Sequence, residues 1–222
     1  MNALESLAVI GVASCFLLLA NVPARESVAL RGEKLEMLPA AEAARRIEDY
    51  ARSELPACFA DLQGEDGILT RAIVAVEYVE HSALENFMET VAVKIAARLG
   101  MSVPDLSLGP AQMRPSTVCR LLPEHEGCLN SVPHQDVALS LLSRCRNIQL
   151  AQQLVAVMLG KQRVEYAAFD PKVASAVARE YNGQQDNGLE NLIYRALVTH
   201  IYVNNLARLS LEAGVASAGR QP

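Results

Sequence analysis

The stretch "GEDGILTRAIVAVEYVEHSALENFMETVAVKIAARLG", residues 64–100, decides the fold class of this chain. Apolar side chains recur in it at spacings of three and four, which is the pattern of a helix with a buried face. Those at its start are Ile68, Leu69, Ala72, Ile73 and Val76. Asp66 is suited to cap the helix. Glu77 and Glu80 interrupt the apolar pattern, and a buried carboxyl group is costly unless it is paired or used. The stretch therefore predicts a core helix with two candidate acids.

The rest of the chain favours further helices. Helical periodicity predicts them at 39–55, 134–160, 170–183 and 187–214. Gly160 is expected to end the second of these, and Gly183 the third. In the last helix one face gathers Ile193, Leu197, Ile201 and Leu206. Since no stretch alternates as a half-buried strand does, we expect an all-α protein.

Composition and charge narrow the function classes. The chain has 222 residues, of which 51% are hydrophobic, so it can bury one sizeable core and is not predominantly disordered. A net charge of −5 without any Lys/Arg cluster argues against nucleic acid as a main partner. An uncharged polymer such as a glycan remains compatible with it.

An apolar run at residues 7–20, "LAVIGVASCFLLLA", predicts a signal peptide or a membrane anchor. A buried core helix is the alternative. With the export reading, 1–24 is a leader, 25–60 is a linker with one helix, and 211–222 is a flexible tail. The protein would then reside in the periplasm or cell envelope, with 7–20 as a candidate inner-membrane anchor.

The cysteines favour disulfides over metal. Outside the apolar run the chain has Cys58, Cys119, Cys128 and Cys145, an even set that allows two disulfides in an exported domain. Cys119 and Cys128 are close enough in sequence to close a short loop. No Cys-x-x-Cys pair is present, and "PEHEGC" at 123–128 matches a metal site only by coincidence. We expect no metal and no cofactor.

A polar loop, "LSLGPAQM" at 106–113, separates the predicted helices. Gly109 and Pro110 end one element, and Pro115 is suited to start the next. Between them stands Gln112, whose amide can both donate and accept hydrogen bonds. Such a loop is either an ordinary turn or one wall of a binding cleft.

Five short motifs follow one another in an order that resembles the lysozyme-like transglycosylase family, which includes bacterial lytic transglycosylases and goose-type lysozymes. They are "AIVAVEY" at 72–78, "LGPAQM" at 108–113, "RNIQLAQQL" at 146–154, "EYNG" at 180–183 and "IYV" at 201–203. The resemblance implies a lysozyme-like helical domain at 61–210 that acts on peptidoglycan.

Site residues follow from the same resemblance. It implies that Glu77 is the catalytic acid and that Gln112, with its apolar neighbour Met113, contacts the glycan. The remaining substrate-binding residues that it implies are Tyr181, Asn182 and Tyr202. In the family's mechanism one glutamate protonates the leaving oxygen and then acts as base while the muramyl 6-hydroxyl attacks, which gives a 1,6-anhydro end.

Departures from the family pattern leave alternatives open. Tyr78 follows Glu77 where the family usually has serine, so Glu80 is a second candidate acid. A hydrolase would need another carboxylate, for which Glu65, Asp66 and Asp105 are candidates. The "QQDN" stretch at 184–187 also differs from the family's Gly-Pro. A catalytically silent peptidoglycan-binding protein and an unrelated helical interaction protein are the other readings.

Overall fold

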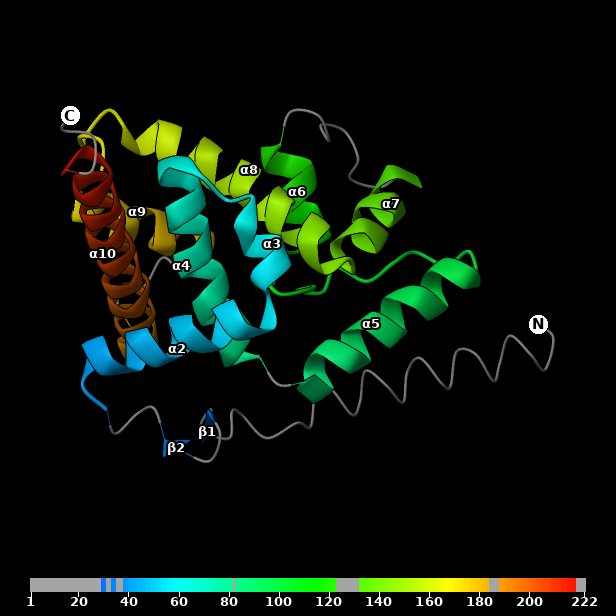
Figure 1. Ribbon diagram of the computed structural model, residues 1–222. Helices are drawn as coiled ribbons and strands as arrows, with labels where there is room; N and C mark the ends of the chain where they lie inside the picture. Colours follow the sequence, from blue (N-terminus) through cyan, green and yellow to red (C-terminus); the bar gives the residue numbers. More distant parts are fainter. Residues whose placement is uncertain are drawn as a thin grey trace.

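The computed structural model is mostly helical, as predicted (Figure 1). It describes residues 29–30, 33–34, 38–81, 83–122, 132–183 and 188–218. The predicted leader at 7–20 and the "PEHEGC" stretch lie outside this part of the chain. None of the helices that the structure describes is both long and apolar enough to span a membrane.

Helices make up the fold, with one minimal strand pair before them. The strands β1 (Ala29–Leu30) and β2 (Glu33–Lys34) are antiparallel. The helices are α2 (Ala40–Glu54), α3 (Pro56–Ala60), α4 (Gly64–Glu80), α5 (Ala83–Arg98), α6 (Pro115–Leu121), α7 (Val132–Leu141), α8 (Arg144–Gln162), α9 (Pro171–Tyr181) and α10 (Leu189–Ala218).

The core is built around α4. Its side chains are buried on nearly every side, because α2, α8 and α10 all pack against it (Figure 1). A helix that is apolar all round is stable only when neighbours cover all of its faces. The buried residues Ala44, Ile47 and Phe59 of α2 and α3 belong to the same core. The segment predicted as a linker with one helix therefore shares its core with the predicted domain.

The start of α4 differs from the prediction. The helix begins at Gly64, and Gln63 occupies the cap position without a side-chain hydrogen bond. Asp66 lies in the first turn instead, where a negative charge is favourable beside the helix dipole. Its Oδ2 accepts a hydrogen bond of 2.8 Å from Gln152 Nε2 of α8. Asp66 therefore links α4 to α8 and does not cap α4.

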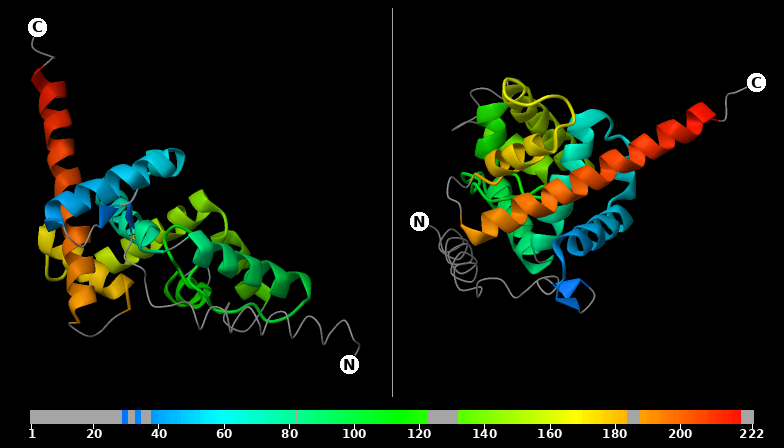
Figure 2. Two further views of the ribbon diagram at one scale, coloured as in Figure 1. Left: turned by 90° about the horizontal axis from the view of Figure 1, so that it is seen from below. Right: turned by 90° about the vertical axis from the view of Figure 1, so that its left-hand side faces the viewer.

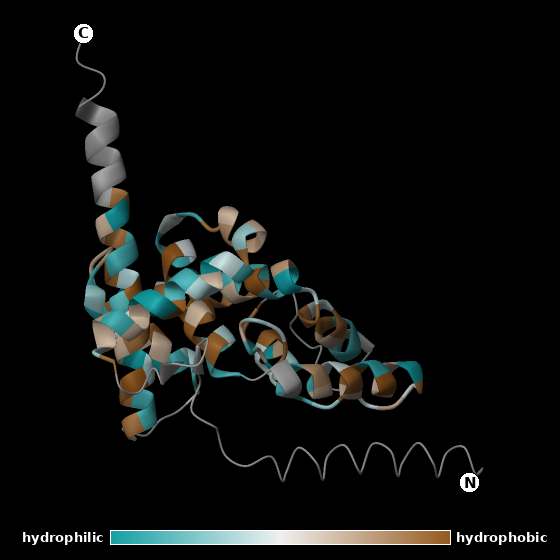
Figure 3. Ribbon diagram, turned by 60° about the horizontal axis from the view of Figure 1, so that its bottom comes forward, coloured by the Kyte–Doolittle hydropathy of each residue, from teal (hydrophilic) through white to brown (hydrophobic). Residues whose placement is uncertain are grey.

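The helical stretch at 64–100 is divided in two. At His81 the backbone is extended, and α5 then runs in another direction than α4 (Figure 1). Figure 3 shows hydrophobic residues recurring along α5: Val93 and Ala96 belong to the core, whereas Phe87 and Ile95 are exposed.

Two helix ends test the glycine predictions. The 134–160 region forms α7 and α8, but α8 continues through Gly160 to Gln162, so the predicted stop at this glycine is wrong. The prediction for 170–183 is confirmed. Asp170 caps α9 by accepting from the Lys172 amide, and Gly183, with φ of 66°, follows the helix end.

The last helix, α10, crosses the core and continues to Ala218, so that its C-terminal end projects beyond the other helices (Figure 2). Most of the predicted flexible tail thus continues this helix. The predicted face is buried only in part: Ile201 is buried, and Leu197 and Leu206 pack against the core half-buried. Ile193 is 50% exposed, and the residues that enter the core are Tyr194, Val198, Ile201 and Tyr202.

A disulfide joins Cys58 of α3 to Cys145 in the first turn of α8. Cys119 is disulfide-bonded as well. Cys128, its predicted partner, lies outside the described residues. The structure therefore confirms that disulfides form among the predicted cysteines.

Candidate active site

The polar loop at 106–113 is held in place by a buried asparagine of α8. Asn147 Nδ2 donates to the carbonyl oxygens of Leu108 (2.8 Å) and Leu141 (3.2 Å). Its Oδ1 accepts from the backbone N–H of Ala111 at 2.8 Å. Every polar atom that Asn147 brings into the core is therefore bonded, as a buried amide requires. The loop is fixed to α8 and is not an ordinary surface turn.

The loop closes on itself with two left-handed residues. Leu108 and Met113 pair through two backbone hydrogen bonds of 3.0 and 3.2 Å. Gly109 has φ of 70° and Gln112 has φ of 49°. A Cβ on Gly109 would come within 2.5 Å of Asn147 Nδ2 and 2.6 Å of the Leu141 carbonyl oxygen. Only glycine fits here, for both the φ angle and the space.

We expect Asn147→Ala to lower the free energy of unfolding by about 3 kcal/mol, because it removes three buried hydrogen bonds at about 1 kcal/mol each. Urea unfolding followed by circular dichroism measures the change. Gln149→Ala is the matched control, since Gln149 is exposed on the same helix. A loss below 1 kcal/mol for Asn147→Ala would show that the asparagine does not hold the loop.

Beside this loop lies a cavity of about 500 Å³. The helices α4, α6, α8 and α9, together with the loop, supply its walls. Its lining residues are Glu77, Glu80, His81, Ser107, Gln112, Met113, Arg114, Thr117, Arg120, Leu154, Tyr181, Asn182 and Gly183. A volume of this size is within the range of small-ligand sites. Most of the residues that the sequence predicted for the site thus meet in one place.

Glu77 is the buried acid of the cavity, with 7% of its surface exposed. Its Oε1 accepts a hydrogen bond of 2.7 Å from the hydroxyl of Tyr194 on α10. Burial, and then the charge of Glu77, raise the pKa of Tyr194 well above its usual range. Tyr194 therefore stays protonated and can only donate to the carboxylate. Glu80 lines the same cavity but is half-buried.

Tyr181 joins α9 to the loop. Its hydroxyl donates to the Ala111 carbonyl oxygen at 2.7 Å. Burial, and then the nearby charge of Glu77, raise the pKa of Tyr181 well above its usual range. Tyr181 therefore lies close to the acid, as the resemblance implies, and supports the loop that carries Gln112.

Gln112 presents an unused acceptor. Its Nε2 donates to Asn86 Oδ1 (2.8 Å) and to the Gly109 carbonyl oxygen (2.9 Å), which sets the orientation of the amide. Its Oε1 is buried and has no hydrogen-bond partner among the described residues. A buried carbonyl oxygen without a partner is costly, so a ligand N–H or O–H at this position would be favourable. The neighbouring Met113 lines the cavity with an apolar side chain.

Tyr202 is not brought into this cavity. Its hydroxyl donates to Glu65 Oε1 at 2.8 Å, and the same carboxylate accepts from the Phe169 amide and pairs with Arg163. Burial, and then this hydrogen bond, raise the pKa of Tyr202. Tyr202 and Glu65 thus join α10 to α4 away from the predicted site.

The other candidate second acids also have partners elsewhere. Asp66 is bonded to Gln152, and Asp105 accepts from the amide and the hydroxyl of Ser116. Neither is among the lining residues of the cavity. In the described part of the lining, the carboxylates are those of Glu77 and Glu80, and both belong to α4.

Tyr78, which follows Glu77 where the family usually has serine, contacts α2. Its ring stacks on that of Tyr50 of α2, with centroids 6.1 Å apart. The residue after Glu77 therefore contributes to the packing of α2 on α4 and is not among the residues that line the cavity.

Glu89 of α5 is a partly buried carboxyl group near Arg114. Burial raises its pKa to about 7, the like charge of Glu85 adds to this, and the charge of Arg114 opposes it. Between pH 4.5 and 7 the unfolded chain loses this proton while the folded chain keeps it, so the folded state is destabilised as pH rises through that range.

Glu89→Gln is therefore expected to raise the free energy of unfolding at pH 8 relative to the parent, and to change it little at pH 4.5. Urea unfolding at both pH values measures this. Glu165→Gln, which removes the same charge from an exposed position, is the control and should show no such dependence. Equal effects of Glu89→Gln at both pH values would contradict the raised pKa.

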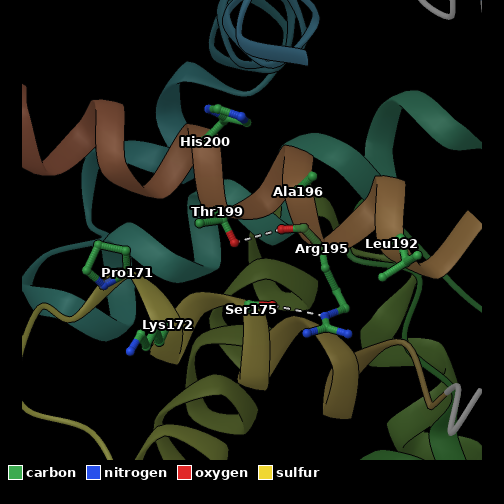
Figure 4. A pocket seen from close by; sticks show the side chains of 8 residues that line it. All are labelled: Pro171, Lys172, Ser175, Leu192, Arg195, Ala196, Thr199 and His200. Atoms are coloured by element: carbon green, nitrogen blue, oxygen red, sulfur yellow. Dashed lines mark hydrogen bonds between the residues drawn. The ribbon is translucent and has the colours of Figure 1, made fainter. Parts of the chain in front are cut away.

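A second hollow, of about 440 Å³, lies between α9 and α10 (Figure 4). Its lining residues are Pro171, Lys172, Ser175, Leu192, Arg195, Ala196, Thr199 and His200. Arg195 Nε donates to Ser175 Oγ at 2.9 Å. Because these residues include no carboxyl group, they offer no acid for cleaving a glycosidic bond. The cavity at Glu77 is the better candidate for that chemistry.

Tyr194 is the site residue that the sequence analysis missed. A pattern in the sequence could have identified it, because Tyr194, Val198 and Ile201 recur at spacings of four and three.

Among the described residues no group of three or more His, Cys, Asp or Glu could hold a metal ion.

Comparisons of the chain with protein-family models, curated proteins and solved structures gave no match.

Proposed function

We propose that this protein is a lytic transglycosylase with a lysozyme-like helical domain. Its substrate would be peptidoglycan, cleaved at the β-1,4 bond between N-acetylmuramic acid and N-acetylglucosamine. The observation that carries the proposal is the buried carboxyl group of Glu77 at a cavity of about 500 Å³, with Tyr194 bonded to one of its oxygens. Gln112, Tyr181 and Asn182 line the same cavity.

The chemistry needs one acid. Glu77 in its protonated form donates its proton to the glycosidic oxygen as the bond to C1 of the muramyl residue breaks. The muramyl 6-hydroxyl then bonds to C1, and the Glu77 carboxylate takes the proton that this hydroxyl loses. The carboxyl group returns to its starting state, and the product carries a 1,6-anhydro ring without consuming water. Tyr194 would keep the carboxyl group oriented through both steps.

The positions of the carboxyl groups favour an internal nucleophile over a hydrolase. Glycosidases with two catalytic carboxyl groups place them on either side of the scissile bond. Glu77 and Glu80 lie one turn apart on the same helix, so they approach a glycan strand from the same wall. In the described lining no carboxyl group faces them, which supports attack by the 6-hydroxyl of the substrate itself.

Gln112 and the tyrosines would hold the glycan. The free Oε1 of Gln112 suits the N–H of an acetamido group, which the sugars of peptidoglycan carry. Asn182 can donate and accept, and Tyr181 adds a flat ring beside the acid. These contacts fit a neutral sugar backbone rather than a phosphate polymer.

We also propose export to the periplasm or cell envelope. Cys58 and Cys145 are joined, and Cys119 is disulfide-bonded too. Disulfides persist in oxidising compartments and are rare in the bacterial cytoplasm. The apolar run at 7–20 supports the same location as a signal peptide or an inner-membrane anchor.

The product of the reaction tests the proposal. The full chain is incubated with purified peptidoglycan, and the released muropeptides are analysed by mass spectrometry. We expect 1,6-anhydromuramyl ends, which are lighter by one water than reducing ends. Reducing ends would instead identify a muramidase-type hydrolase. No release, with peptidoglycan still retaining the protein, would identify a binding or scaffold protein.

A further inference from the structure

The wall formed by α6 carries two arginines. Arg114 directly precedes this helix and Arg120 lies in its last turn, with Thr117 between them, so the three side chains follow one another at spacings of three. All three line the cavity, and both arginines are exposed. In the part of the chain that the structure describes, neither guanidinium makes a hydrogen bond or an ion pair.

Charge is therefore divided between two walls of the cavity. Glu77 and Glu80 lie on α4, whereas Arg114 and Arg120 lie on the α6 side. The charge of Arg114 acts on Glu89, and Arg120 lies in the last turn of α6, but neither arginine forms an ion pair among the described residues. Guanidinium groups suit carboxylates in particular, since their N–H groups match the two oxygens. Bond cleavage in a neutral glycan would not need them.

We propose that Arg114 and Arg120 bind a carboxylate of the substrate, so that the preferred substrate is an anionic, carboxylate-bearing glycan. The proposal rests on the proposed function, since it concerns the same cavity. In peptidoglycan such a carboxylate has two sources. One is the lactyl ether of an N-acetylmuramic acid without peptide, and the other is the stem peptide.

The test compares three oligosaccharides of equal length in binding to the parent protein, measured by calorimetry at low salt on ice to limit turnover. They are a neutral N-acetylglucosamine oligomer, a bare glycan with free lactyl carboxylates, and a peptide-bearing glycan. We expect at least one carboxylate-bearing oligomer to bind about tenfold tighter than the neutral one, since charge-assisted hydrogen bonds are the stronger kind but exposed charges are screened. The preference should shrink as salt is added.

Variants assign the preference to the arginines. Arg114→Gln with Arg120→Gln is expected to remove it while leaving the affinity for the neutral oligomer unchanged. Arg98→Gln, which removes the same charge at an exposed position of α5, is the matched control. Because both arginines are exposed and form no ion pair among the described residues, the variants should fold, and their thermal midpoints check this. If the double variant loses the tighter binding of the bare glycan, the arginines bind the lactyl carboxylate. If it loses the tighter binding of the peptide-bearing glycan alone, they bind the stem peptide.

Two outcomes would overturn the inference. If the double variant keeps the preference, or the parent binds all three oligomers equally, the arginines do not select a carboxylate. Cleavage of peptidoglycan by the parent would in that case still support the proposed function. If none of the oligomers binds and peptidoglycan stays intact, the proposed function fails and the arginine assignment fails with it.

Discussion

Glu77→Gln is expected to lower the rate of release of anhydro-ended muropeptides by about 10³-fold, since a positioned general acid contributes about 10² to 10⁴ and this residue would serve as acid and base in turn. The amide keeps the size of the side chain, and its oxygen can still accept from the Tyr194 hydroxyl. The variant should therefore keep the fold. Turnover of purified peptidoglycan, quantified by mass spectrometry, measures the loss.

Glu80→Gln is the matched control for this experiment. Glu80 lines the same cavity and carries the same carboxyl group, but it is half-buried rather than buried. We expect its rate to stay within about tenfold of the parent's, as for a residue outside the proton transfer. The opposite result, with Glu80→Gln inactive and Glu77→Gln active, would move the acid by one turn of α4. Peptidoglycan binding by both variants shows that substrate is still held.

The second large effect concerns stability. Cys58→Ser with Cys145→Ser is expected to lower the free energy of unfolding by about 4–5 kcal/mol, because this disulfide closes a long loop, with a sequence separation of 87. In the chain-entropy account the open variant gains conformational freedom in the unfolded state. That loss is a large share of the stability of a typical domain. Guanidinium unfolding of the variant and the oxidised parent measures it.

Ser102→Ala is the control, since it removes one exposed hydroxyl group and leaves the Cys58–Cys145 disulfide in place. It should unfold as the parent does. A loss below 1 kcal/mol for the Cys58 and Cys145 variant would mean that the helices α3 and α8 are held together equally well by packing alone.

Local signals in the sequence predicted the loop at 106–113 but left open whether it is a turn or a cavity wall. Gly109 and Pro110 end one element and Pro115 begins another, because these residue types constrain the backbone locally. In the structure Gln112 and Met113 of this loop line the cavity. The anchor of this loop on Asn147 comes from 36 residues further along the chain, and a single sequence offers no physical rule for that pairing.

The face of α10 shows where periodicity fails. Isoleucine and leucine at 193, 197, 201 and 206 suggested one face, of which Ile201 is buried but Ile193 is 50% exposed, while Tyr194 and Val198 beside this face are buried. Both faces are apolar, so the hydrophobic pattern alone does not choose between them. In this orientation the hydroxyls of Tyr194 and Tyr202 bond to Glu77 and Glu65. Tyr202 had been expected at the site from the "IYV" motif of the resemblance, whereas Tyr194 is the tyrosine that bonds to Glu77.

A hydrogen bond to another helix accompanies the difference at the predicted cap of α4. Asp66 has the chemistry of an N-cap, yet its carboxylate bonds to Gln152 of α8, because tertiary contacts override a local preference worth about 1 kcal/mol. The division of charge between α4 and α6 is likewise a property of three-dimensional packing, since Glu77 and Arg114 are far apart in sequence.

The two tyrosine–carboxylate bonds of α10 have a mechanical consequence. Tyr194 and Tyr202 attach one helix to α4 at two separate points, through Glu77 and Glu65. Two attachments along one helix restrict both its sliding and its rotation more than one attachment would. The bond between Glu65 and Tyr202 therefore helps to fix the position of the Tyr194 hydroxyl beside Glu77. In the proposed mechanism, a substitution at Glu65 or Tyr202 would alter the orientation of the Glu77 carboxyl group, although neither residue lines the cavity.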